Sequence, residues 1–291
     1  MKAPDFNYCC PKTAEEACGL LATADSDVRI LAGGQSLVPA MNLRMASADL
    51  LIDINRIEAF KGITLSEDGK WVRVGALVRH AEVAVSPLIA EYVPLVHKAM
   101  RYVAHPAVRN RGTSCGSLAL ADPSAEMPAC AMALNAVLVL QSKKDGVRCV
   151  PARNFFFGLY DTARRDDEIL IEVRWPCSSQ GSYTGFDELS RRHGDFALVG
   201  IAVECQLKGS RIGHLNVVSF GTGPVPRLSE RAAEIAAGQP PTQQLAHQLA
   251  AQIAAEIDPD DVADVDIKQR QANAIARRVL VQVFQECAHA N

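Results

Sequence analysis

The first third of the chain alternates short apolar runs with polar turns, a pattern typical of an α/β fold. Residues 13–24 (TAEEACGLLATA) place apolar side chains at helical spacing behind a threonine cap. The apolar runs at 28–32 and 49–54 predict two buried strands, with a glycine-containing loop and a helix between them. This order predicts a small α/β unit.

The middle of the chain mixes hairpins with helices. Residues 63–76 alternate around Asp68-Gly69, which predicts a β-hairpin. Residues 81–104 have helical periodicity interrupted by two prolines, and residues 128–142 predict a helix that runs into a strand. The segment KKDG at 143–146 predicts a turn, after which 147–156 continues the chain.

The pattern changes near residue 176. A polar, proline-marked connector (WPCSSQGS, 175–182) leads into residues 185–221, where alternating faces predict antiparallel strands. From Leu228 the chain is alanine-rich and helical, with breaks at GQPPT (238–242) and DPDD (258–261). We therefore predict one domain over residues 1–176 and a second over 177–291.

Composition narrows the class of protein. The 291 residues are 48% hydrophobic and 22% charged with a net charge of -3, as in ordinary globular proteins, and offer no basic footprint for nucleic acid. No apolar run approaches the ~18 residues of a membrane-spanning helix. The N-terminus lacks an apolar signal core, which predicts a cytoplasmic protein.

The nine cysteines predict reduced thiols, because their number is odd and no export signal accompanies them. There is no C-x-x-C motif, and the adjacent pair Cys9-Cys10 does not match iron–sulfur or zinc spacing. The histidines are dispersed without metal-ligand spacing. We therefore expect no metal site in this chain.

A bare loop follows the first predicted strand, in LAGGQSLVPAMNLRM (31–45). Adjacent glycines let main-chain N–H groups approach an anion without a Cβ in the way, and Ser36 adds a hydroxyl. The loop lacks the G-K-[ST] of a P-loop and the G-x-G-x-x-G of a Rossmann site. Taken alone, it is explained more simply as a tight turn that needs glycine at positive φ.

A second glycine loop lies at RNRGTSCGSLALADPSAE (109–126) and favours anion binding over a purely structural turn. It follows a basic pair, Arg109 and Arg111, which either neutralises an anion or is solvated surface charge. Asp122-Pro123 predicts the N-cap and first residue of the next helix. Two such loops in one domain indicate a dinucleotide whose diphosphate is held from both sides.

These two loops closely resemble those of the FAD-binding subunits of molybdenum hydroxylases, a family that includes the carbon monoxide dehydrogenase medium subunit and the flavin domain of xanthine dehydrogenase. Three further segments fall in the family's order: PARNFFFGLYDT, DEILIEVRWP and FDELSRRHGDFALVG. The resemblance implies an α+β protein. Its parts are a two-lobed α/β FAD-binding domain of the PCMH type, split near residue 56, and a C-terminal domain with a three-stranded antiparallel sheet and helices.

The resemblance also implies which residues contact FAD. The segment SRRHGD (190–195) is implied to approach the flavin from the C-terminal domain. Glu126 matches an acidic position close to FAD, and no catalytic residue is implied. The full implied set is Leu31, Ala32, Gly33, Gly34, Gln35, Ser36, Leu37, Val38, Val103, Ala104, Thr113, Ser114, Cys115, Gly116, Ser117, Glu126 and Leu170.

The second loop departs from the family pattern G-T-I-G-G-S-L-A-H-A-D-P at two places. Ser114-Cys115 replaces an Ile-Gly pair, and Leu120 replaces a histidine. A β-carbon at Cys115 would be strained if the backbone there needed positive φ. Leu120 removes a polar group near the cofactor, which bears on flavin tuning more than on binding.

The resemblance implies an electron-transfer subunit. Its partners would be a large molybdopterin subunit and a small [2Fe–2S] subunit, in a dimer of heterotrimers that delivers electrons to an external acceptor. Two alternatives remain at this point. One is a self-contained FAD oxidoreductase of the same superfamily, and the other is a nucleotide-binding or assembly protein that has lost flavin.

Overall fold

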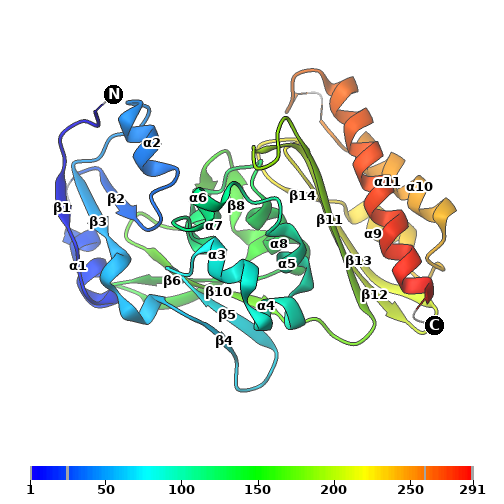
Figure 1. Ribbon diagram of the computed structural model, residues 1–291, viewed down its shortest axis with the longest axis horizontal. Coiled ribbons are helices and arrows are strands. Elements are labelled where there is room, and N and C mark those ends of the chain that lie inside the picture. Colours follow the sequence, from blue (N-terminus) through cyan, green and yellow to red (C-terminus); the bar gives the residue numbers. More distant parts are fainter. Residues whose placement is uncertain (1, 24–25, 259, 290–291) are drawn as a thin grey trace.

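The computed structural model describes residues 2–23, 26–258 and 260–289. Figure 1 shows an elongated molecule with the N-terminal lobe (blue) at one end and the C-terminal helices (red) at the other. A five-stranded sheet with its helices lies between them. The predicted α+β class, with an antiparallel sheet and helices in the C-terminal part, is confirmed.

The N-terminal lobe is a parallel sheet in the order β1-β3-β2. Its elements are β1 (Asn7–Cys9), α1 (Ala14–Thr23), β2 (Val28–Leu31), α2 (Leu37–Asn42) and β3 (Leu50–Asp53). The predicted α/β unit over 28–54 is thus present. Thr13 caps α1 as predicted, its Oγ1 accepting from Glu16 N at 3.1 Å. Ala24, the last residue of the predicted helix, lies outside the described residues.

The central sheet is antiparallel in the order β4-β5-β10-β6-β7. Its strands are β4 (Ile63–Leu65), β5 (Trp71–Gly75), β6 (Val137–Ser142), β7 (Gly146–Pro151) and β10 (Ile169–Pro176). Two short helices, η1 (Ile54–Arg56) and η2 (Glu58–Phe60), connect it to the first lobe. The predicted hairpin at 63–76 and the turn at 143–146 are both confirmed.

Six helices accompany the central sheet: α3 (His80–Val85), α4 (Pro87–Tyr92), α5 (Pro94–Ala99), α6 (Pro106–Arg109), α7 (Ser114–Leu120) and α8 (Glu126–Leu134). The prolines that interrupt residues 81–104 stand at the first positions of α4 and α5, where the missing N–H costs nothing. A short helix η3 (Ala152–Asn154) leads into a two-stranded hairpin, β8 (Phe156–Gly158) and β9 (Asp161–Thr162).

One predicted helix start is wrong. Asp122-Pro123 does not begin a helix, because α8 starts at Glu126 with Ala125 at its N-cap. The Asp122 carboxylate instead accepts from Ser124 N at 2.9 Å and stabilises a turn. The second glycine segment also contains α7 rather than an open loop, because Thr113 caps a new helix there.

The C-terminal part holds an antiparallel sheet in the order β11-β12-β13-β14. Its elements are β11 (Ser182–Ser190), β12 (Ala197–Lys208), β13 (Arg211–Phe220), β14 (Arg227–Leu228), α9 (Glu230–Ala236), α10 (Gln243–Ala255) and α11 (Val265–His289). The predicted three long strands are present, and the two-residue β14 adds a fourth. The DPDD break lies between α10 and α11, with Pro259 outside the described residues.

This second sheet is covered on both faces, which positions the site described below. Helix α11 packs against β11 and β12, while α5 and α8 of the preceding part pack against β11, β12 and β13. Strand β12 is therefore buried along most of its length. Among the helices of the described chain, none combines the length and apolarity that a membrane crossing requires.

Candidate cofactor site

The first glycine loop makes a tight turn between β2 and α2. Gly34 has φ +71°, and a β-carbon there would lie 3.1 Å from Leu31 Cδ1 and 3.2 Å from Val38 Cγ2. The positive φ favours glycine over any other residue. Ser36 is the N-cap of α2 but forms no side-chain cap bond, so its exposed hydroxyl remains available to a ligand.

The second segment is the beginning of α7. Thr113 Oγ1 accepts from Gly116 N at 3.0 Å and caps the helix. A β-carbon on Gly116 would stand 2.7 Å from that same oxygen, so glycine preserves the cap. Ser114 is buried, and its hydroxyl has no hydrogen-bond partner in the described structure.

The two glycine segments touch each other. A β-carbon on Gly33 would lie 2.4 Å from Arg111 O and 2.7 Å from Gly112 Cα, closer than atoms can approach. On the opposite side, a β-carbon on Gly112 would meet Gln35 Cγ at 3.6 Å. The contact therefore requires a residue without a side chain at Gly33, and it joins the N-terminal lobe to the central part of the chain.

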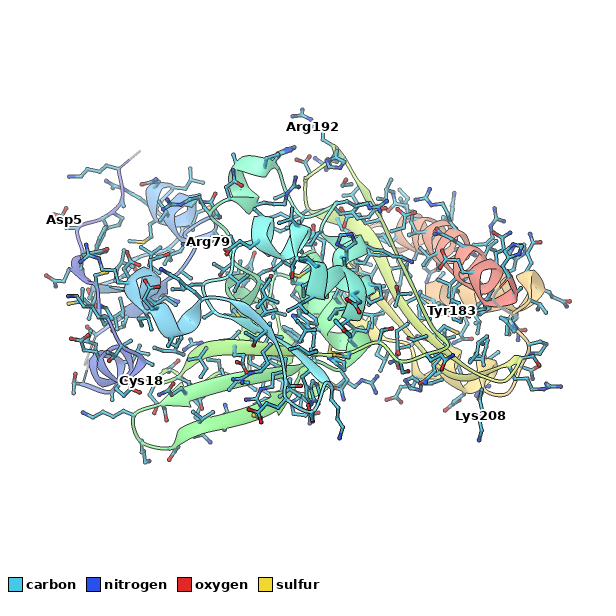
Figure 2. The ribbon with its side chains drawn as sticks, turned by 60° about the horizontal axis from the view of Figure 1, so that its bottom comes forward. Asp5, Cys18, Arg79, Tyr183, Arg192 and Lys208 are labelled. Carbon is cyan, nitrogen blue, oxygen red and sulfur yellow. The ribbon has the colours of Figure 1, made fainter. Side chains whose placement is uncertain are left out.

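Two residues that the sequence did not single out connect these segments. Asn55 Nδ2 donates to Ala32 O at 2.8 Å, behind the first loop. Arg79 donates to Asn55 Oδ1 at 2.5 Å and to Arg111 O at 2.6 Å, and so lies between the lobes (Figure 2). No periodicity or motif distinguishes an asparagine after β3 or an arginine before α3, and only the tertiary contacts reveal them.

The basic residues near the second segment have different roles. Arg109 Nη1 donates to Val103 O at 2.9 Å and to Ala104 O at 2.8 Å, and so supports the backbone where Ala104 has φ +43°. Arg111 is exposed and could neutralise an anion. Burial, followed by the charge of Arg109, lowers the pKa of His80 to about 4, so this imidazole is neutral at pH 7.

The SRRHGD segment comes back to the same region from the C-terminal sheet. Gly194 has φ +85°, and a β-carbon on it would lie 2.8 Å from His105 Cε1 and 3.0 Å from the carbonyl carbon of Ala104. The structure thus brings Gly194 of this segment against Ala104. Figure 2 shows Arg192 at the tip of this segment.

Other predicted contacts are buried in the protein interior. Cys115 has no positive φ because it belongs to α7, so its β-carbon causes no strain. Its thiol donates to Val74 O at 3.7 Å, and burial raises its pKa, so its side chain packs towards β5. Leu170 is buried on β10 opposite Leu140, and Glu126 is buried at the start of α8.

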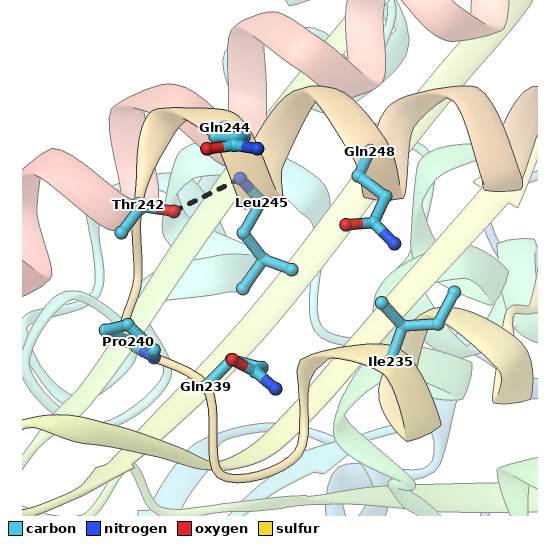
Figure 3. Close-up of a pocket in the computed structure, with 7 residues that line it drawn as sticks. All are labelled: Ile235, Gln239, Pro240, Thr242, Gln244, Leu245 and Gln248. Atoms are coloured by element: carbon cyan, nitrogen blue, oxygen red, sulfur yellow. Dashed lines mark hydrogen bonds between the residues drawn. The ribbon is translucent and has the colours of Figure 1, made fainter.

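The pocket shown in Figure 3 has a different character. It has a volume of about 300 Å³ and lies beside Ile235 of α9 and Gln248 of α10, in the C-terminal part. Thr242 Oγ1 accepts from Leu245 N at its edge. No titratable residue lines it, so it offers amide, hydroxyl and apolar contacts. Elsewhere in the described residues, no three His, Cys, Asp or Glu side chains gather as a metal site would require.

Comparison with known proteins gives consistent matches over nearly the whole chain. Residues 4–178 match the FAD binding domain in molybdopterin dehydrogenase, and residues 184–286 match the CO dehydrogenase flavoprotein C-terminal domain. The carbon monoxide dehydrogenase medium chain of Hydrogenophaga pseudoflava is 35% identical over 290 residues, covering 99% of this chain and 100% of that protein.

Solved structures agree with the sequence matches. A carbon monoxide dehydrogenase from Hydrogenophaga pseudoflava, lacking the Mo-pyranopterin moiety of its cofactor, superposes with a TM-score of 0.93 at 35% identity, covering 99% of this chain and 100% of that chain. Quinoline 2-oxidoreductase from Pseudomonas putida 86 superposes with a TM-score of 0.92 at 34% identity, with 99% of both chains covered.

These matches confirm that the chain resembles the FAD-binding subunits of molybdenum hydroxylases. They also confirm FAD as the implied cofactor. The related complexes are oxidoreductases, named for carbon monoxide in one case and for quinoline in another. The chain belongs to the FAD-binding medium-subunit family of the carbon monoxide dehydrogenase type of molybdenum hydroxylases.

Proposed function

We propose that the two glycine segments hold the FAD diphosphate between them. The observation that carries this proposal is the contact of Gly33 with Arg111 and Gly112, which brings two stretches of main-chain N–H groups together. The proposed binding residues are Leu31 to Val38, Val103 and Ala104, Thr113 to Ser117, Glu126 and Leu170.

The unpaired polar atoms beside this contact fit such a ligand. Ser114 Oγ and His80 Nδ1 are buried without partners in the described structure, and each such group is costly unless a ligand or water satisfies it. The His80 ring lies 3.1 Å from the position of a β-carbon on Gly112. Because this imidazole is neutral, one ring nitrogen can accept and the other can donate.

The proposed role is electron transfer. Bound FAD would accept electrons and pass them on, while this chain binds, orients and surrounds it. The sequence contains no cysteine spacing for an iron–sulfur cluster, so we place the [2Fe–2S] clusters on a small partner subunit and the molybdopterin on a large one. Two such heterotrimers would form the complex, in the cytoplasm, with an external electron acceptor.

The domain division forms part of the proposal. We assign residues 1–176, with its lobes divided near residue 56, to FAD binding, and residues 177–291 to the C-terminal domain. Strand β10 ends at Pro176 and β11 begins at Ser182, so a short connector separates the two sheets. Residues 190–195 then return to Ala104 and would close the cofactor site from the second domain.

The test is an absorbance spectrum of the protein purified from its native cells, together with cofactor release and a subunit gel. The proposal predicts released FAD, iron–sulfur absorbance, molybdenum and two co-purifying chains. A yellow chain without partners would instead favour the self-contained oxidoreductase. A colourless chain that does not bind added FAD would overturn the proposed cofactor site.

A further inference from the structure

Two buried carboxyl groups interact electrostatically where the part proposed to bind FAD packs against the C-terminal sheet. Glu126 is the first residue of α8 and is 5% exposed, while Glu188, near the end of β11, is 7% exposed. Cys130 lies one turn further along α8, and burial, followed by the charges of both carboxyl groups, raises the pKa of its thiol. The two glutamates therefore belong to one cluster in the interior.

No cation neutralises this pair among the described residues. Both carboxyl oxygens of Glu188 are buried without a hydrogen-bond partner, and neither glutamate forms an ion pair. The neighbouring acids are Asp122 beside Glu126 and Asp187 beside Glu188. Arg278 forms an ion pair with Asp187, and the Tyr102 hydroxyl donates to Asp187 Oδ1 at 3.2 Å. These two groups therefore stabilise the Asp187 carboxylate and not Glu188.

Such an environment favours the protonated form. Burial first, and then the charge of Asp122, raises the pKa of Glu126 to about 7. Burial first, and then the charges of Glu126 and Asp187, raises the pKa of Glu188 to about 8. Two like groups that interact lose their protons in successive steps, because the charge of the first carboxylate holds the remaining proton on the pair. Near neutral pH the pair holds about one proton.

The pair adjoins the proposed FAD site on both sides. Helix α8 packs against α7, whose first residues form the second glycine segment. Strand β11 continues from Glu188 into the segment whose Gly194 touches Ala104. Negative charge that arrives at a cofactor held between these segments would raise the pKa of both carboxyls. By reciprocity, the protonation state of the pair would change the affinity of the site for electrons.

We propose that Glu126 and Glu188 form a redox-linked proton site, which binds one further proton from water when two electrons enter the FAD site. This inference rests on the proposed function. The electrons come from the reduced iron–sulfur partner, or from dithionite in the test below. The proton converts one carboxylate of the pair to a carboxylic acid, forming one O–H bond. The half-buried Asp122 accepts a hydrogen bond from exposed Tyr160 at 3.4 Å, and its charge acts on Glu126.

The experiment is a redox titration of the flavin absorbance in the purified complex between pH 6 and pH 9. Wild type is compared with Glu188→Gln, which removes one of the two titrating carboxyl groups at nearly the same side-chain size. The matched control is Glu204→Gln. Glu204 is a partly buried carboxyl of the same sheet, but Asn216 Nδ2 donates to it at 3.0 Å.

Above pH 7, we expect the equilibrium constant for two-electron reduction to fall more steeply with pH in wild type than in Glu188→Gln. The additional fall of this equilibrium constant in wild type approaches tenfold per pH unit, which corresponds to about 30 mV per pH unit in the potential of a two-electron couple. The control should follow wild type. Equal slopes in wild type and Glu188→Gln, with full flavin content in both, would overturn the inference and leave the proposed function intact.

A second measurement does not depend on flavin. The infrared carbonyl band of protonated carboxyl groups is recorded at pH 7 in the isolated chain, and we expect Glu188→Gln to lose the intensity of about one group. An unchanged band would show that the pair carries no proton and would overturn the inference. A complex without FAD would overturn the proposed function and the redox linkage together.

Discussion

At the scale of single residues, the site depends on the absence of one side chain. Gly33 has ordinary backbone angles, but no β-carbon fits between it and Arg111 O. Its role therefore differs from that of Gly34, which supplies positive φ. A sequence shows both as glycine, and the structure distinguishes the two physical reasons.

Replacing Gly33 by alanine should separate the two glycine segments and lower FAD affinity at least tenfold. The measurement is a fluorescence titration of the flavin-free chain with FAD. Gly19→Ala is the control, because Gly19 lies in α1 with nothing within 4 Å of its would-be β-carbon. That control should bind FAD normally and gain roughly 0.5–1 kcal/mol of helix stability. Normal FAD binding by Gly33→Ala would show that the contact is not needed for the cofactor.

Glu188 should also make stability depend on pH. A raised pKa means that the folded protein binds this proton more tightly than the unfolded chain does. The associated stability is complete below the unfolded pKa of about 4.3 and is lost as pH rises through the folded pKa of about 8. Glu188→Gln should therefore gain free energy of unfolding relative to wild type between pH 5 and pH 8.5, by on the order of 1–3 kcal/mol.

The control for this prediction is Glu168→Gln. The free energy of unfolding of wild type and of both variants is measured by urea unfolding at each pH. Although burial opposes it, hydrogen bonds from Arg148 and Arg165 lower the pKa of Glu168. Because its pKa is lowered, its replacement should destabilise the fold by an amount that varies little with pH in this range. A Glu188→Gln effect that does not vary with pH would contradict the shifted titration of that group.

At the scale of elements, α7 links local helix chemistry to the site. Thr113 caps it through Gly116 N, and the same residues form the second half of the proposed cradle. The helix has seven residues, so its stability depends strongly on its cap and on packing. In the proposed site, local capping and cofactor binding are therefore coupled at this position.

Thr113→Ala should cost about 1 kcal/mol of stability and also weaken FAD binding. Thr242→Ala is the matched control, because Thr242 caps α10 with the same kind of bond, to Leu245 N at 3.2 Å, outside the site. Both variants should lose similar stability in thermal unfolding, and Thr113→Ala alone should lose FAD affinity. Equal FAD affinities in the two variants would show that the cap of α7 is purely structural.

At the scale of the whole molecule, Asn216 joins the C-terminal sheet to helices of the central part. Its Nδ2 donates to Ala133 O of α8 at 2.7 Å, and its Oδ1 accepts from Arg153 at 2.9 Å. The side chain is 5% exposed, so its partners would be left unsatisfied inside the molecule if it were removed. The central part and the C-terminal sheet are thus held together by a buried polar contact as well as by apolar packing.

Asn216→Ala should lower the free energy of unfolding by roughly 2–3 kcal/mol and separate the unfolding of the two parts. Both tryptophans, Trp71 and Trp175, lie in the central sheet, so their fluorescence reports on that part. Circular dichroism reports on the helices of both parts. In wild type the two signals should change together, and in the variant they should diverge. Gln206→Ala, which removes an exposed contact to Ser179, should leave them coincident.

The sequence alone determined the family, the cofactor and most elements, because these depend on local patterns: glycine spacing, apolar periodicity and turn residues. It placed the strand–helix–strand unit over 28–54 and the helix and strand over 128–142. The prediction from the sequence was wrong for one helix start. Asp122-Pro123 has the composition of a helix start, but the chain uses it for a turn, and α8 begins at Glu126.

The tertiary structure alone decided what meets across long sequence separations. Three interactions join residues that are distant in the sequence: the Arg79 contacts to Asn55 and Arg111, the fit of Gly33 against Gly112, and the electrostatic effect of Glu126 on Glu188. No local pattern encodes these contacts, since each depends on how close-packed elements approach one another. Burial, which shifts the pKa values of these carboxyl groups, is likewise a property of the folded molecule.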